Sequence, residues 1–107
     1  MEYKELKALH KEIVDTANRV LALMDKAGIS GRDYTRVKQI REDKQKPVPK
    51  EIFNDYKNKS NDALERNVIN DKNDLTNLKR LEKRYANYAD AVKRNLKEEI
   101  LHYTNNI

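Results

Sequence analysis

Apolar residues recur every three or four positions through the first quarter of the chain. The stripe consists of Leu6, Leu9, Ile13, Ala17, Val20 and Met24. This spacing places all of its members on one face of an α-helix. The pattern predicts a helix from about Tyr3 to Ala27. Gly28 follows it and suits the left-handed conformation that commonly ends a helix.

A second long stripe occupies the C-terminal third. Its members are Leu75, Leu78, Leu81, Tyr85, Tyr88, Ala89, Val92 and Leu96. It predicts a second long helix, and the polar run from Asn70 to Asp74 predicts a break before it. Because this run contains neither Gly nor Pro, a helix that continues through it is the alternative.

The middle of the chain predicts shorter helices. Ser30 suits the N-cap of a helix that ends near Asp43, and its apolar side consists of Tyr34, Val37 and Ile40. The connector from 44 to 48 precedes a third helix, for which Pro49 suits the first turn. The apolar residues of that helix are Ile52, Phe53, Tyr56, Ala63, Leu64 and Val68.

These elements predict an all-α fold, a helical bundle of three to four helices with the two long helices at the chain ends. We expect the long helices to pack antiparallel, with the middle helices covering them. The 107 residues correspond to a single domain, 1–107. The apolar faces are wide enough for an intramolecular bundle. The alternative is that part of one face serves a homodimer.

Composition excludes several kinds of chemistry. The chain has no Cys, and His10 and His102 are its only histidines. Neither histidine has an evident partner in sequence, no two carboxylates share an apolar face, and no Gly-rich phosphate loop or metal-ligand spacing occurs. We therefore expect no enzymatic activity, no metal and no cofactor. The longest apolar run, Val20 to Met24, is too short for a membrane span, and we expect a cytoplasmic protein.

Positive charge is concentrated in two parts of the chain. The net charge is +5 overall, of which residues 29–50 carry +4 and residues 75–107 carry +3, while the remainder is net negative. A local excess of this kind attracts polyanions or acidic protein surfaces. The sequence thus favours a nucleic acid or an acidic protein as the partner.

The first basic segment has the side chains of a DNA-reading helix. Arg32, Thr35, Arg36 and Gln39 are expected on the face opposite Val37 and Ile40, flanked by Lys38, Arg41, Lys44 and Lys46. Arg can bind guanine through two hydrogen bonds, Gln can bind adenine, and Lys positions phosphates. The alternative is a solvated amphipathic helix followed by a basic connector.

Residues 35–52, TRVKQIREDKQKPVPKEI, resemble the recognition helix and following loop of phage Cro-type helix-turn-helix repressors. The residues that follow the order of that family are Val37, Ile40, Asp43, Lys44, Gln45, Pro47 and Ile52. Asp43 stands where the family usually has Gly, and Gln45 where it usually has a basic residue. The family also has two short helices before this point, whereas residues 3–27 predict one. The resemblance implies DNA contact by residues 32–46.

The second basic group forms a ridge on the last predicted helix. We call it the basic ridge, and it consists of Lys79, Arg80, Lys83, Arg84, Lys93, Arg94 and Lys97. Such a ridge can follow phosphates or meet an acidic partner. It is also typical of a solvated helix face.

The sequence therefore predicts a small basic helical protein that binds nucleic acid, with DNA favoured. Its expected role is that of a regulator or accessory factor of a phage or mobile element. The alternative is a protein–protein interaction module. This would be a small helical inhibitor, anti-defence or immunity protein that docks on an acidic partner surface, with its charge steering the encounter.

Overall fold

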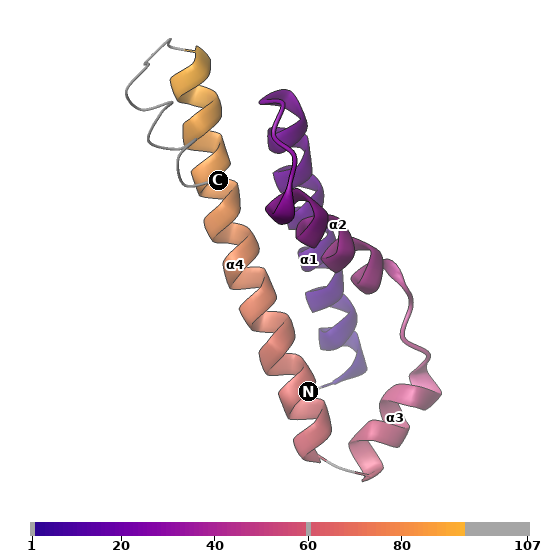
Figure 1. The fold of residues 1–107 in the computed structure, drawn as a ribbon. Helices are drawn as coiled ribbons and strands as arrows, with labels where there is room; N and C mark the ends of the chain where they lie inside the picture. Colours follow the sequence, from indigo (N-terminus) through magenta and orange to yellow (C-terminus); the bar gives the residue numbers. More distant parts are fainter. Residues whose placement is uncertain (1, 60, 94–107) are drawn as a thin grey trace.

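Four helices build the fold (Figure 1). The computed structural model describes residues 2–59 and 61–93, and within these ranges there is no strand. The helices are α1 (Tyr3–Lys26), α2 (Arg32–Gln45), α3 (Lys50–Lys59) and α4 (Asn61–Lys93). The predicted all-α bundle with long helices at its ends is confirmed. No helix in the described part of the chain is long and apolar enough to cross a membrane.

The turn between α1 and α2 is built on two glycines. Gly28 has a φ of 69°, its N–H donates to the Asp25 carbonyl at 3.2 Å, and the Ile29 N–H donates to the Met24 carbonyl at 2.8 Å. This is a Schellman motif, and it confirms the predicted end of α1. The predicted Ser30 cap is wrong, because Gly31, with a φ of 121°, occupies the N-cap position without a side-chain cap bond.

The break predicted at Asn70–Asp74 is also wrong, and the continuous alternative is correct. α4 runs through this segment because Asp71 points inward and is bound there, while Asn70, Lys72 and Asn73 are exposed. The interruption lies ten residues earlier instead, between the end of α3 and the start of α4. α2 likewise extends two residues past the predicted end, to Gln45.

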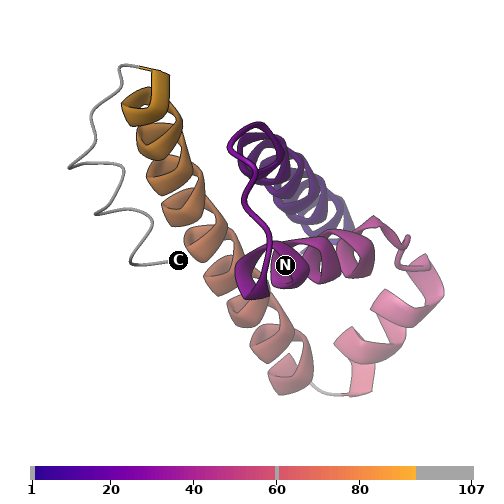
Figure 2. The same cartoon turned by 45° about the horizontal axis from the view of Figure 1, so that its top comes forward.

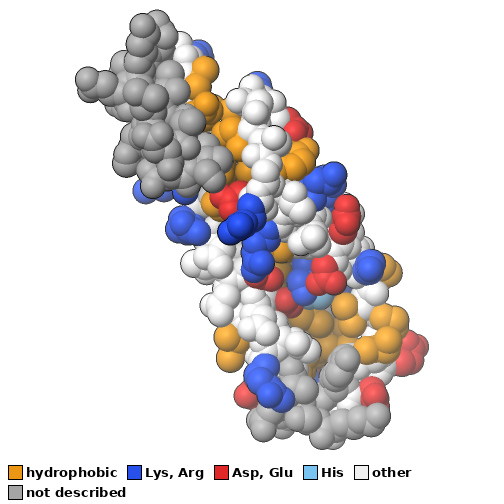
Figure 3. Space-filling view, viewed as in Figure 1, with side chains coloured by type: hydrophobic (Ala, Val, Ile, Leu, Met, Phe, Trp, Pro, Cys, Tyr) orange, Lys and Arg blue, Asp and Glu red, His pale blue; other side chains and the backbone are white. Residues whose placement is uncertain are grey.

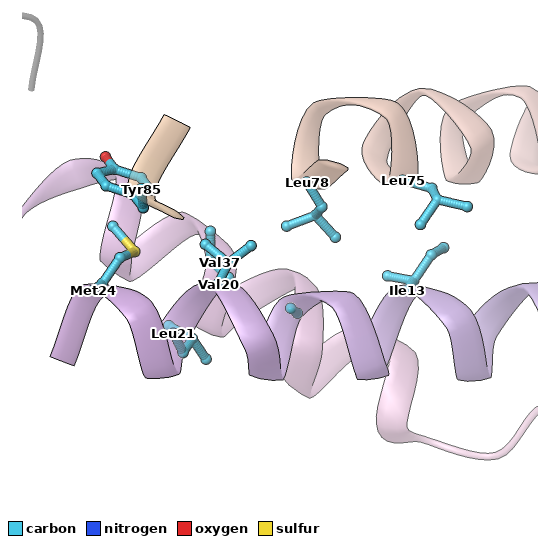
Figure 4. Close-up of a cluster of buried hydrophobic side chains, with 9 residues drawn as sticks. Ile13, Val20, Leu21, Met24, Val37, Leu75, Leu78 and Tyr85 are labelled. Atoms are coloured by element: carbon cyan, nitrogen blue, oxygen red, sulfur yellow. The ribbon is translucent and has the colours of Figure 1, made fainter. Parts of the chain in front are cut away.

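The two long helices run parallel, so the antiparallel prediction is wrong. Near the start of the pair Ile13 of α1 faces Leu75 of α4, and near its end Met24 lies beside Tyr85 (Figure 4). Residue numbers therefore increase in the same direction along α1 and α4. Figures 1 and 2 show the same direction for both helices, with α2 returning along α1.

The length of the return path explains the parallel arrangement. The 24 residues of α1 rise about 36 Å at ~1.5 Å per residue. The 14 residues of α2 return about 21 Å, and the extended residues 46–49 add about 13 Å. The chain is thus back beside the start of α1, where the Tyr3 hydroxyl donates to the Val48 carbonyl. α4 then begins at the same end as α1.

The core consists of two apolar clusters along a molecule of 55 × 20 × 20 Å. The larger cluster consists of Ile13, Ala17, Val20, Leu21, Met24, Val37, Leu75, Leu78 and Tyr85. The smaller cluster consists of Leu6, Phe53, Leu64 and Val68, through which α3 packs on α1 and α4. Val37 is buried as predicted, and Ile40 packs on the larger cluster while half-buried.

The predicted stripe on α4 fails at its end. Val92 is 46% exposed, and Ala91 is buried instead. Val92 lies two turns beyond Tyr85, which is already level with Met24 near the end of α1. Little of α1 remains there to cover it. Leu96 lies outside the described residues.

Cross-linking can test the parallel packing. Lys26 of α1 and Asp90 of α4 line the same surface hollow. Because the chain has no native Cys, we expect Lys26→Cys/Asp90→Cys to be joined by a short bismaleimide within one monomer, as measured by mass spectrometry. Lys26→Cys/Glu65→Cys is the matched control, since antiparallel helices would bring these two positions together. Cross-linking of the control pair alone would contradict the fold.

Candidate nucleic-acid interface

α2 presents most of the predicted DNA-contacting side chains to solvent. The exposed members of the predicted set are Arg32, Thr35, Arg36, Lys38, Gln39 and Lys46. Val37 holds the opposite side of α2 in the core, which is why these residues face outward. Within the described chain, Arg32, Arg36 and Gln39 have no side-chain partner. Lys38 Nζ lies 5.8 Å from the centroid of the Tyr34 ring.

Arg41 and Lys44 are placed differently from the rest of the set. Arg41 is half-buried, its Nη1 donates to Asn18 Oδ1 at 3.4 Å, and its Nε is buried without a partner. The Lys44 side chain is only 16% exposed, and its Nζ lies 2.6 Å from Asp71 Oδ1. These two cations hold α2 against α1 and α4.

Acidic side chains limit the basic face to the first two turns of α2. Glu42 and Asp43 are exposed in its C-terminal half, and Asp43 Oδ2 lies 3.3 Å from Lys44 Nζ. The remaining acid, Asp33, is half-buried and accepts a hydrogen bond from the Tyr85 hydroxyl at 3.1 Å. We call the exposed residues Arg32, Thr35, Arg36, Lys38 and Gln39 the α2 face. It is the most concentrated positive surface of this helix.

The basic ridge on α4 is separate from the α2 face. Lys79 Nζ lies 3.2 Å from Glu12 Oε1, so this end of the ridge faces α1, whereas α4 meets α2 through Asp71 and Tyr85. The guanidinium of Arg84 lies 5.9 Å from the Tyr85 ring centroid. The exposed members of the ridge are Lys79, Arg80, Lys83 and Lys93, of which Lys79 is paired with Glu12. Arg94 and Lys97 lie outside the described residues.

A buried charge cluster, which the sequence did not reveal, joins three helices. Asp71 of α4 is 4% exposed. Its Oδ2 lies 2.9 Å from Nε2 of His10 on α1, and its Oδ1 lies 2.6 Å from Lys44 Nζ on α2. His10 therefore has an Asp partner that was not evident in the sequence, and the cluster contains a single carboxylate. His102 lies outside the described residues.

One signal in the sequence points to this cluster. Asp71 continues the apolar spacing of α4 between Val68 and Leu75. A carboxylate at such a position faces the core and needs partners there. A break over residues 70–74 would place Asp71 in a loop, whereas the continuous helix turns it toward the core.

Asp71 and Lys44 of this cluster both remain charged near neutral pH. Burial favours the neutral carboxyl, but hydrogen bonds from His10 and Lys44 outweigh it and lower the pKa of Asp71 below its ordinary value of 3.8. Burial likewise opposes the charge on Lys44, but its hydrogen bond to Asp71 raises its pKa above 10.5.

The pKa of Tyr85 is raised to about 12 by burial and by the Asp33 carboxylate.

The cluster positions α2 against α1 and α4. No group of three or more His, Cys, Asp or Glu side chains within residues 2–59 and 61–93 is arranged to hold a metal ion. The carboxylate of Asp71 is occupied by Lys44 and His10. The geometry therefore separates two sets of cations, those that fix α2 in place and those that α2 displays.

The stability contribution of Asp71 can be measured by urea unfolding. Asp71→Asn should lower the free energy of unfolding by about 1–3 kcal/mol near neutral pH, because Lys44 loses its buried charged partner. Asp15→Asn is the control. It breaks an exposed ion pair with Lys11, which should cost about 0–0.5 kcal/mol.

The stability difference between wild type and Asp71→Asn should depend on pH. Since the pKa of Asp71 is lowered, its contribution is present above the unfolded value and is lost as pH falls through the folded value. The difference between wild type and Asp71→Asn should thus shrink below about pH 4. A difference that is unchanged at low pH, or equal for both variants, would contradict this role.

Comparison with family models, with curated proteins and with solved structures gives no match for this chain. A functional assignment therefore depends on the chemistry of its surfaces, since fold class alone does not define a function.

Proposed function

We propose that the protein binds nucleic acid, with duplex DNA favoured, through the α2 face, and that it acts as a regulator or accessory factor of a phage or mobile element. The observation that supports this proposal is the state of Arg32, Arg36 and Gln39. All three are exposed on one side of a helix, and none has a side-chain partner among the described residues. A ligand can therefore bind these three side chains without the loss of an existing side-chain contact.

The dimensions of α2 suit a DNA groove. An α-helix with its side chains is about 10–12 Å across, and the major groove of B-DNA is about 12 Å wide. α2 is anchored in the core through Val37 and leaves its opposite side open. Arg32 and Arg36 are suited to guanine, Gln39 to adenine, and Lys38 to phosphate.

The resemblance to Cro-type repressors supports only part of this arrangement. α1 is an uninterrupted helix of 24 residues, so no short helix precedes α2 in the manner of that family. α2 instead lies along α1 as the second half of a helical hairpin. In our proposal α2 enters the groove from this hairpin, with α1 as its rigid support.

A protein–protein interaction module is the second candidate. Glu42 and Asp43 favour it, because these exposed carboxylates share α2 with the basic residues. They repel phosphates, whereas a protein surface can offer a matching cation to each. Ile52 on α3 is 48% exposed and suits the same kind of partner, which would carry an acidic patch opposite the α2 face.

Charge reversal on α2 tests the proposal. Arg32→Glu/Arg36→Glu/Lys38→Glu should abolish binding to a fluorescent duplex at 50–100 mM salt, measured by anisotropy, because each lost phosphate contact also forgoes counterion release. The wild-type affinity should fall with salt with a log–log slope of about −2 to −3, for two or three contacts at about −0.9 each.

The matched control is Arg80→Glu/Lys83→Glu/Lys93→Glu, which changes the net charge equally at exposed positions of α4. Binding should be retained by this variant, and far-UV circular dichroism should show that both variants fold. If only the α4 variant loses binding, the basic ridge is the contact surface. If the wild type binds no nucleic acid at low salt, the interaction-module function takes its place.

A further inference from the structure

A lysine-rimmed hollow lies between the first half of α1 and the connector that follows α2. Its volume is about 370 Å³. Leu6, Val14 and Val48 contribute its apolar lining, four lysines and His10 contribute to its border, and no Asp or Glu lines it. Figure 3 shows hydrophobic side chains recessed among charged ones on this side of the molecule. The hollow is distinct from the α2 face.

Two of the four lysines keep an uncompensated charge. Lys44 is paired with Asp71, and Lys11 Nζ lies 2.7 Å from Asp15 Oδ2. Lys7 and Lys46 have no carboxylate partner among the described residues, and Lys7 Nζ lies 5.7 Å from the Tyr3 ring centroid. The border of the hollow therefore carries a net positive potential.

The hollow is held open by contacts of Tyr3. The Tyr3 hydroxyl donates to the Val48 carbonyl, which ties the connector to α1, and the Tyr3 ring lies 5.4 Å from the Phe53 ring, centroid to centroid. A following proline restricts the backbones of Lys46 and Val48 to extended conformations. Small-molecule sites are typically such largely preformed hollows of about 300–1,000 Å³ with apolar walls and a few polar groups.

We propose that this hollow binds a small organic anion. A compact apolar or aromatic body lies against Leu6, Val14 and Val48, and one carboxylate or phosphate group lies between Lys7 and Lys46. Lysine acts as a compact point charge and, unlike arginine, imposes no bidentate geometry, so the border accepts either head group. The proposal is independent of nucleic-acid binding, because none of these residues belongs to the α2 face.

Amide NMR titration of the isotope-labelled full chain tests the proposal with four probes. Phenyl phosphate and phenylacetate should shift the amides of residues 3–14 and 44–48 in a saturable manner, and the tighter of the two identifies the preferred head group. Inorganic phosphate should bind at least about tenfold more weakly than phenyl phosphate, because it has no apolar body to bury. Benzylammonium should cause no saturable shift at these amides.

A pair of double variants provides the matched comparison. Lys7→Gln/Lys46→Gln should weaken the preferred aromatic anion about fivefold or more, the effect of losing two partly exposed charge contacts. Lys72→Gln/Lys83→Gln removes the same charge from exposed positions of α4 and should leave the affinity unchanged. The proposal is overturned if both variants weaken binding equally, if inorganic phosphate binds as tightly as phenyl phosphate, or if no probe shifts these amides.

Discussion

The buried ion pair between Asp71 and Lys44, with His10 as its third member, constrains the whole bundle. Its members come from α4, α2 and α1, and the cluster lies between the two apolar clusters of the core. Sliding α4 by one turn would leave the Asp71 carboxylate unpaired among apolar side chains. An uncompensated buried charge costs several kcal/mol. The cluster thus favours one register of α4 against α1 over neighbouring registers of similar apolar pattern.

That register also decides which cations are available to a partner. Lys44 neutralises Asp71, and Arg41 binds Asn18 of α1, so both contribute to holding α2 in place. The first two turns of α2 are anchored on their inner side by Val37, by Tyr34 and by the hydrogen bond from Tyr85 to Asp33, so their outer cations are not needed to hold the helix in place. A helix with a fixed inner side and an unpaired outer side can meet a ligand at little cost in conformational entropy.

This small protein consequently combines two kinds of recognition surface. The α2 face is convex and polar, and it suits a groove or a flat charged surface. The hollow beside the connector is concave and apolar with a positive border, and it suits a compact ligand. Both depend on the connector that follows α2. Residues 46–48 lead the chain away from α2 and also form one wall of the hollow.

The sequence by itself determined the helical class, the extent of α1, the Gly28 turn and the exposure of Arg36 and Gln39, because each depends on local spacing or on the conformation of one residue. Only the tertiary structure decided the parallel packing, since this depends on the summed lengths of α2 and its connector. The partnership of His10 with Asp71 likewise depends on helices brought together across 61 positions. Periodicity describes one helix at a time, and a buried charge is recognised only when its partners from other helices are in place.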